Sequence, residues 1–501
     1  MIDRYIKKIL DASVYDVAEE TPLDPAPLLS SRLGQSVWLK REDLQPIFSF
    51  KIRGAYNRIA HVPANRGVVT ASAGNHAQGV ALAARRLGLR AVIVMSENTP
   101  AIKVNAVAQH GPEIVLTGES FDEAAAYAAK LAADEGLEYI HPFDDDDVIA
   151  GQGTIGMELL RQHTGDIDAV FVPVGGGGLI AGIGAYIKYL RPGTRVIGVE
   201  AEGSDCMARA LAAGRRVSIR ADELEQFADG TAVRQAGKRT FRLAQEVVDD
   251  VITVSVDEIC AAIKDIFEET RVMAEPAGAL ALAGLKRYAG QGPRKASLVA
   301  IVSGANVNFD RLRHISERTE VGEKRELLLG VTIPEKPGAF RRFCRTIGKR
   351  AVTEFNYRYA DASAAHVLVG LQTDPASRDR DEITSRLARD YKVADLSDNE
   401  VAILHVRHMV GGRAAGVADE RLYRFEFPEK PGALLRFLEQ LGDHYNISMF
   451  HYRNHGSAYG RVLAGIQVPP GRQRSFRRDM DELGFRYWDE TDNAAYQLFL
   501  G

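Results

Sequence analysis

Short apolar runs alternate with longer alanine-rich segments between about residues 66 and 305 of this chain. Segments such as Ala77–Leu87 and Leu179–Leu190 have the spacing of helices. The runs between them are apolar throughout instead of alternating, which is typical of parallel strands buried on both faces. The pattern therefore predicts an α/β domain with a doubly wound parallel sheet. The predicted strands are Gly67–Thr70, Ala91–Met95, Ile114–Thr117, Ala169–Val174, Val196–Glu200, Val251–Val254 and Ser297–Val302.

The pattern changes near residue 311. Residues 311–326 are dense in charge and poor in apolar side chains, which is typical of a connector. Beyond the connector, Ile333–Phe340 (IPEKPGAF) recurs as Phe427–Leu434 (FPEKPGAL), 94 positions later. Two further segments recur at an offset of 95 positions: FNYR at 355–358 matches FHYR at 450–453, and VLVGLQ at 367–372 matches VLAGIQ at 462–467.

Each copy of this repeat reads as strand, Pro-Gly turn, helix, strand and strand. That order predicts two small α+β modules of βαββ type, because two copies of so long a period are too few for a solenoid. A chain of 501 residues is also too long for one hydrophobic core. We therefore expect three domains, at residues 1–320, 325–398 and 420–493.

Composition excludes several classes of partner. The chain is 46% hydrophobic and 26% charged, with a net charge of −4 and no basic footprint for nucleic acid. Its three cysteines are too far apart for a disulfide framework or a zinc site, so we expect reduced thiols and no metal. The N-terminus has no signal-peptide pattern, and no apolar run is long enough to span a membrane. We expect a cytoplasmic protein that binds neither nucleic acid nor membrane.

Lys51 is the first candidate for chemistry, within the sequence SFKIRGA at 49–55. A lysine that forms an imine must be neutral part of the time, and burial or a nearby cation lowers its pKa. Arg53 is a candidate source of such a field, and Phe50 offers an apolar surface for a flat ring. On its own, a lysine is more often a solvated surface residue.

Three polar clusters, at residues 72–76, 175–178 and 303–306, follow predicted strands, where ligands of doubly wound folds bind. Ser72, Gly74, Asn75 and His76 fall where a helix begins, a position that suits a carboxylate but also ordinary helix capping. The glycines Gly175–Gly178 permit a backbone loop around a phosphate. They do not form the G-x-G-x-x-G pattern of a dinucleotide site, so a single phosphate is favoured.

Ser303 ends the last predicted strand. A serine hydroxyl that faces a pyridine nitrogen does not keep the nitrogen protonated as an aspartate would. The ring is then a weaker electron sink, which favours elimination at Cβ over transamination. Together with the lysine and the glycines, this serine points to pyridoxal 5'-phosphate (PLP).

The residues SFKIRGA, ASAGNHAQG, PVGGGGL, EPAGALALAG (Glu275–Gly284) and VSGAN resemble PLP-dependent enzymes of fold type II, in particular the serine/threonine dehydratases. The repeated PEKPGA modules resemble the ACT-like regulatory pair of the biosynthetic threonine dehydratases. The resemblance covers nearly the whole chain. It implies a catalytic domain of two doubly wound α/β subdomains, followed by two regulatory modules.

The resemblance also implies roles for single residues. Lys51 would bind the coenzyme covalently and remove the α-proton, and Glu275 would lie near the site. Phe50, Asn75, Gly175–Gly178 and Ser303 would contact the coenzyme ring, its 3'-oxygen, its phosphate and its pyridine nitrogen, and Ser72, Gly74 and His76 would shape the pocket for the substrate carboxylate. For the regulatory modules, we expect effector contacts near Phe355, Tyr357, Phe450 and Tyr452, although aromatic residues on strands are more often core.

The implied reaction is conversion of L-threonine to 2-oxobutanoate and ammonia, the first committed step of isoleucine biosynthesis. Isoleucine would inhibit it and valine would counteract the inhibition, in a homotetramer. Four alternatives stay open: a serine-preferring dehydratase, an amino-acid racemase of the same fold, a PLP enzyme that catalyses β- or γ-replacement, and a non-catalytic amino-acid sensor.

Overall fold

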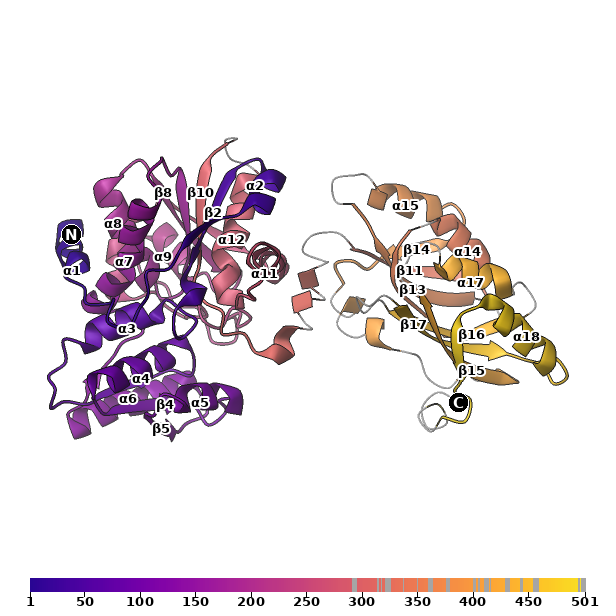
Figure 1. Ribbon diagram of the computed structural model, residues 1–501, viewed down its shortest axis with the longest axis horizontal. Coiled ribbons are helices and arrows are strands. Elements are labelled where there is room, and N and C mark those ends of the chain that lie inside the picture. Colours follow the sequence, from indigo (N-terminus) through magenta and orange to yellow (C-terminus); the bar gives the residue numbers. More distant parts are fainter. Residues whose placement is uncertain are drawn as a thin grey trace. The chain divides into compact units, whose positions relative to one another are not determined.

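The chain forms two compact units in the computed structural model, Met1–Gly322 and Glu323–Gly501 (Figure 1). Much of the charged connector predicted at 311–326, together with Pro337 and residues 429–432 of the repeated turn, lies outside the described residues. The described residues are 1–290, 295–312, 315–316, 318–319, 326–336, 338–348, 350–358, 364–374, 379–399, 402–403, 406–409, 414, 416–428, 433–441, 445–453, 459–493 and 496.

The first unit contains a six-stranded sheet of order β1-β2-β10-β7-β8-β9, parallel except for β1. Its strands are β1 (Leu23–Pro25), β2 (Ser36–Arg41), β7 (Ala169–Pro173), β8 (Arg195–Ala201), β9 (Asp250–Val254) and β10 (Ser297–Val302). The helices of this part are α1 (Ile2–Leu10), α2 (Pro27–Leu33), η1 (Glu42–Leu44), α3 (Lys51–Ile59), α7 (Asp146–Gln162), α8 (Gly178–Leu190), α9 (Cys206–Ala213), α10 (Lys238–Val247), α11 (Val256–Thr270), α12 (Pro276–Ala289) and η2 (Phe309–Arg311).

A second, four-stranded parallel sheet of order β5-β4-β3-β6 lies in the same unit. Its strands are β3 (Val68–Ala71), β4 (Ala91–Met95), β5 (Glu113–Leu116) and β6 (Glu138–Tyr139), and its helices are α4 (Asn75–Leu87), α5 (Ala101–Ala108) and α6 (Phe121–Glu135). Every strand predicted from an apolar run is present, with its ends shifted by at most one residue. Two parallel sheets with flanking helices confirm the predicted α/β architecture.

The central strands of the larger sheet explain the continuous apolar runs. Ala169 and Phe171 of β7 pack in an apolar cluster that includes side chains of α11 and α12. Val170 and Val172 of the same strand pack in a second cluster, with side chains of α7 and α8. Successive side chains of a strand point to opposite faces, so a sheet covered on both faces requires apolar residues at every position.

The second unit is an eight-stranded antiparallel sheet of order β14-β11-β13-β12-β16-β17-β15-β18. The first copy of the repeat comprises β11 (Glu326–Pro334), α14 (Ala339–Ile347), β12 (Val352–Arg358), β13 (Ala364–Gln372), α15 (Asp379–Leu387) and β14 (Lys392–Asp395). After η3 (Val406–His408), the second copy comprises β15 (Glu420–Pro428), α17 (Ala433–Leu441), β16 (Asn446–Arg453), β17 (Tyr459–Gln467), α18 (Gln473–Leu483) and β18 (Arg486–Asp489).

The predicted βαββ module was therefore too short, because each copy continues with a second helix and a fourth strand. The α15 helix is mostly polar, and only Ile383 and Leu387 are buried within it, so its periodicity is weak. Buried side chains of the helices, such as Phe343, Phe437 and Phe476, share one apolar cluster with the sheet. The helices thus cover one face of the sheet, and the two copies join through the pairing of β12 with β16.

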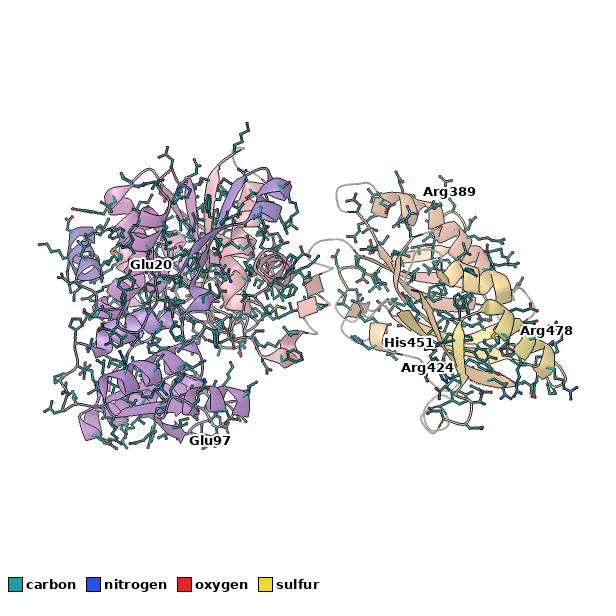
Figure 2. All side chains as sticks on the ribbon, viewed as in Figure 1. Glu20, Glu97, Arg389, Arg424, His451 and Arg478 are labelled. Carbon is teal, nitrogen blue, oxygen red and sulfur yellow. The ribbon has the colours of Figure 1, made fainter. Side chains whose placement is uncertain are left out.

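Charged side chains lie mainly at the periphery of each unit. Figure 2 shows Glu97 at the outside of the first unit and Arg389 and Arg478 at the outside of the second, and all three are exposed. In the described part of the chain, no helix combines the length and the hydropathy that a membrane crossing needs. The same residues contain no group of three or more His, Cys, Asp or Glu that could hold a metal ion.

Candidate active site

Lys51 is the first residue of α3, and its amine is buried. Its Nζ donates a hydrogen bond to the carbonyl oxygen of Pro142 at 3.1 Å and lies 5.3 Å from the centre of the Phe50 ring. Burial lowers the pKa of Lys51 to about 8, and the charge of Glu275 opposes the shift. The structure thus supplies an amine that is partly neutral near neutral pH, as a nucleophile or base requires.

The expectation that Arg53 lowers the pKa of Lys51 is wrong. Arg53 is fully buried and forms ion pairs with Glu42 at 2.8 Å and with Glu158 at 2.6 Å. Lys40, also fully buried, pairs with Glu158 at 2.5 Å. The positive charge of Arg53 is therefore balanced within this cluster, and desolvation is what shifts Lys51.

The glycines Gly175–Gly177 lie between β7 and α8, and Gly178 is the first residue of α8. Gly177 has a φ of 93°, a left-handed conformation that side chains other than glycine rarely adopt. The carbonyl of Gly176 accepts hydrogen bonds from Thr240 Oγ1 at 2.6 Å and from the Gly237 N–H at 3.2 Å. Within the described residues, no protein group accepts the N–H groups of Gly175–Gly177. These donors, at the N-terminus of a helix of 13 residues, suit an anion such as a phosphate.

The cluster Ser72–His76 leads into α4, which begins at Asn75. Ser72 Oγ accepts the N–H of Gly74 at 3.3 Å, and both residues are half-buried at the helix N-terminus. His76 is buried, and its Nε2 lies 3.0 Å from the carbonyl oxygen of Ile140. Burial lowers the pKa of His76 to about 3, so its ring is neutral. Ser72 and Gly74 can hold a carboxylate, and the His76 ring is fixed by its contact with the carbonyl of Ile140.

Asn75 belongs to a chain of polar contacts. Its Nδ2 donates to Glu275 Oε1 at 2.7 Å, and its Oδ1 accepts from Asn306 Nδ2 at 2.8 Å. Burial, with a contribution from Asp229, raises the pKa of Glu275 to about 7. The sequence interpretation gave Asn306 no role, although this residue ends the VSGAN motif that follows the predicted strand Ser297–Val302.

Ser303 follows β10 and is buried, and its hydroxyl donates to the carbonyl of Ala277 at 3.4 Å. Its carbonyl accepts the N–H of Phe50 at 3.2 Å, so the segment that carries Lys51 runs beside the segment that carries Ser303. The structure thereby brings residues about 250 positions apart into one site. The carbonyl of Pro142 also belongs to this site, and no local sequence pattern predicts it.

The residues present fit PLP. A buried amine of lowered pKa can bind an aldehyde, unpaired backbone N–H groups can hold a phosphate, and Asn75 and Ser303 offer polar groups for the ring substituents. The Phe50 ring, close to the Lys51 amine, supplies an apolar surface for the flat ring of the coenzyme.

The four aromatic residues predicted to contact effectors meet in the second unit. Phe355 pairs with Tyr452, and Tyr357 with Phe450, across the junction of β12 and β16. All four side chains are buried in the apolar core, and the rings of Phe355 and Phe450 lie 5.6 Å apart. Tyr357 also donates a hydrogen bond from its hydroxyl to Glu335 Oε2 at 2.5 Å. Their role as effector contacts stays a prediction.

A cleft lies next to this core, between the two copies of the repeat. Glu335 is part of its lining and connects it to Tyr357. The lining residues are Pro334, Glu335, Lys336, Gly338, Phe340 and Arg341 of the first copy and Leu438, Tyr445, Asn446 and Ile447 of the second.

Comparison with known families agrees with this arrangement. Residues 14–304 match the family described as pyridoxal-phosphate dependent enzyme. Residues 317–406 and 411–500 each match the C-terminal regulatory domain of threonine dehydratase. The two matches to the second family correspond to the two copies of the repeat.

Relatives match along the whole chain. The biosynthetic L-threonine dehydratase of Burkholderia multivorans is 55% identical, covering 99% of this chain and 99% of that protein. The biosynthetic L-threonine dehydratase of Escherichia coli is 53% identical, covering 99% and 97%. Among solved structures, isoform 2 of threonine deaminase from Solanum lycopersicum is 48% identical with a TM-score of 0.62, covering 64% of this chain and 88% of that one. Maize serine racemase is 34% identical with a TM-score of 0.58, covering 62% and 95%.

Proposed function

The chain belongs to the family of biosynthetic threonine dehydratases, which convert L-threonine to 2-oxobutanoate and ammonia with PLP. On that premise we propose that Lys51 is the catalytic residue of this reaction. The observation that carries this proposal is the buried Lys51 amine, of lowered pKa, which bonds to the carbonyl of Pro142, while the next residue, Phe143, lies against Gly176 of the glycine loop. The sequence similarity extends over the full length of the threonine dehydratases, including both regulatory domains, which favours threonine dehydration over the racemase alternative.

When bound, PLP supplies a ring that withdraws electrons from the substrate and makes its α-proton acidic. Lys51 would hold the coenzyme through Nζ, and its free Nζ would accept the α-proton of the substrate. The carbonyl of Pro142 would orient this amine. Loss of the β-hydroxyl as water, followed by hydrolytic release of ammonia, completes the balance from threonine to 2-oxobutanoate.

The remaining predicted residues would bind and orient the coenzyme and the substrate. The N–H groups of Gly175–Gly178 would hold the phosphate, and Asn75 would bind the 3'-oxygen of the ring. Ser303 would face the ring nitrogen without charging it, which favours elimination over transamination. Ser72, Gly74 and the N-terminus of α4 would hold the substrate carboxylate, and His76, fixed on the carbonyl of Ile140, would help to shape this pocket.

We further propose that isoleucine inhibits the enzyme from the cleft next to Tyr357 and that valine counteracts it. Glu335 offers a carboxylate for an ammonium group, and Lys336 and Arg341 offer cations for a carboxylate. Phe340 and Ile447 offer apolar surface for a branched side chain. A cleft with both charges and an apolar wall suits a branched-chain amino acid. The homotetramer and the cytoplasmic location are proposals that rest on the resemblance to this family.

An assay of ketoacid formation by purified protein tests the function. We expect faster turnover of L-threonine than of L-serine, inhibition by isoleucine and partial recovery with valine. Formation of D-serine as the main product from L-serine would support a racemase instead. Turnover only with a second, nucleophilic substrate would support a replacement enzyme, and absence of turnover would support a sensor.

A further inference from the structure

The segment His141–Asp144 connects the catalytic lysine to the phosphate loop. The carbonyl of Pro142 accepts the hydrogen bond from Lys51 Nζ at 3.1 Å. The ring of the next residue, Phe143, lies against Gly176. A Cβ atom at position 176 would lie 2.3 Å from Phe143 Cγ and 2.4 Å from both Cδ atoms, closer than real Cβ contacts. The two ends of the coenzyme site therefore meet on consecutive residues of one segment.

This segment is held rigidly on both sides. His141 Nδ1 accepts the N–H groups of Phe143 at 3.2 Å and of Asp144 at 2.9 Å. The rings of His141 and Phe143 pack edge to face with centres 4.7 Å apart. The carboxylate of Asp144 then accepts the first N–H groups of α10, including Arg239 at 2.7 Å. A turn fixed by these bonds and tied to the N-terminus of α10 cannot move its aromatic ring aside cheaply.

The N-terminal part of α10 also contacts the glycine loop. Its residue Thr240 donates from Oγ1 to the carbonyl of Gly176 at 2.6 Å, and Gly237 donates its N–H to the same carbonyl at 3.2 Å. Gly176 is thus held by hydrogen bonds through its carbonyl and by the Phe143 ring at its Cα. Its φ is not in the left-handed region, so the φ strain that applies at Gly177 does not apply at Gly176.

We infer that Phe143 is a positioning residue that shapes the phosphate loop, and that position 176 requires glycine because of the Phe143 ring. The inference rests on the proposed role of the loop in binding the PLP phosphate. Two neighbouring positions would then require glycine for different physical causes. Gly176 is required by a side-chain contact, whereas Gly177 is required by its φ of 93°.

PLP titration of the apoprotein tests the inference. Gly176→Ala should weaken PLP binding about 10- to 100-fold, because the new methyl group displaces the loop or the ring. Phe143→Ala should weaken it less, about 3- to 10-fold, through a looser loop. The double variant should bind PLP within about threefold of Phe143→Ala, because the two changes share one contact. A double variant as weak as the product of both single effects would overturn the inference.

Gly177→Ala is the matched control. Its strain comes from backbone torsion and from Met207 Cε at 2.4 Å, so adding Phe143→Ala should not restore PLP binding. Restoration there as well would show that truncating Phe143 merely loosens the whole site, and would overturn the inference. Thermal unfolding of each apoprotein separates loss of folding from loss of binding.

Pyridoxal without its phosphate separates this inference from the proposed function. The wild-type protein should bind PLP much more tightly than pyridoxal, and Gly176→Ala should reduce that preference. Equal affinity of the wild type for both would reject the phosphate role of the loop. A clear preference without rescue in the double variant would reject only the role of Phe143.

Discussion

Each unit buries one arginine between two glutamates, but the two clusters are satisfied differently. In the catalytic unit, Arg53 pairs with Glu42 and Glu158, and Lys40 adds a second cation. Two buried cations therefore balance two buried carboxylates. The remaining Arg53 hydrogen bonds go to Thr154 Oγ1 at 3.1 Å and to the carbonyl of Glu19 at 3.0 Å. The cluster is complete in itself and anchors α3, the helix that begins with Lys51.

In the regulatory unit, Arg407 lies against Glu326 at 3.1 Å and Glu354 at 3.0 Å. Arg407 contacts both carboxylates, and its Nη1 has no hydrogen-bond partner among the described residues. The Asn356 side chain donates to the carbonyl of Arg407 at 2.8 Å, and its own oxygen is unpaired in the same part of the structure. Every side-chain nitrogen of Arg53 has a hydrogen-bond partner, whereas Arg407 Nη1 and Asn356 Oδ1 have none among the described residues.

The largest expected effect is the loss of turnover on replacing Lys51, which should leave effector binding by the other unit intact. Lys51→Ala should reduce turnover by more than about a thousandfold, because the amine that accepts the α-proton is lost. The visible absorbance of lysine-bound coenzyme should also disappear. Isoleucine binding, measured by calorimetry, should persist, because the cleft lies in the other unit. Lys130→Ala, at an exposed position, is the control, and substantial activity in Lys51→Ala would reject the assigned role.

Replacing either buried arginine should lower the stability of its unit more than replacing an exposed one. Arg53→Met should destabilise the catalytic unit by about 3–5 kcal/mol, because it leaves buried carboxylates unpaired. Arg407→Met should cost the regulatory unit a similar amount, about 3–5 kcal/mol, because Glu326 and Glu354 both lose this cation. Arg90→Met, which removes exposed ion pairs to Glu113 and Glu135, should cost less than about 1 kcal/mol.

Tryptophan fluorescence in urea can follow each unit separately. The chain has two tryptophans, Trp38 in the catalytic unit and Trp488 in the regulatory unit. Replacing one with Phe reports on the other unit alone. Equal losses for Arg53→Met and Arg90→Met would contradict the view that Arg53 anchors α3.

A smaller effect concerns regulation. Tyr357→Phe removes the hydroxyl that donates to Glu335, a residue of the cleft. The isoleucine concentration that gives half-inhibition should rise about 5- to 20-fold, with the uninhibited kcat unchanged. Tyr487→Phe removes a hydroxyl bonded to Asp481, outside the cleft, and should leave inhibition as it was. Equal shifts in both variants would place the effector elsewhere.

The smallest expected effect is on pH dependence. Only the neutral amine of Lys51 reacts with the coenzyme aldehyde, so the rate of PLP binding to the apoprotein should rise with pH through about 8 and then level off. The charge of Glu275 raises this pKa, so Glu275→Gln should move the midpoint to lower pH and make binding roughly two- to fivefold faster near pH 7. Glu97→Gln, at an exposed site, should not move it. A shift to higher pH in Glu275→Gln would contradict this account.

Several features could be predicted because they are local. Continuous apolar runs predicted the parallel strands, and the recurrence of PEKPGA predicted the duplication. The glycines were predicted at a strand-to-helix turn and lie there. The second helix of each module was missed because its burial depends on few apolar residues, and the role assigned to Arg53 was wrong because its partners are far away in the sequence.

The sequence by itself determined which segments become strands and helices, since burial on one or both faces imposes a spacing on neighbouring residues. It also determined that the chain carries a lysine, a glycine loop and two related modules. Only the tertiary structure decided that Lys51 meets the carbonyl of Pro142, that Phe143 covers Gly176, and that β12 pairs with β16. Those contacts join distant segments, and they depend on how whole elements pack, which no local spacing encodes.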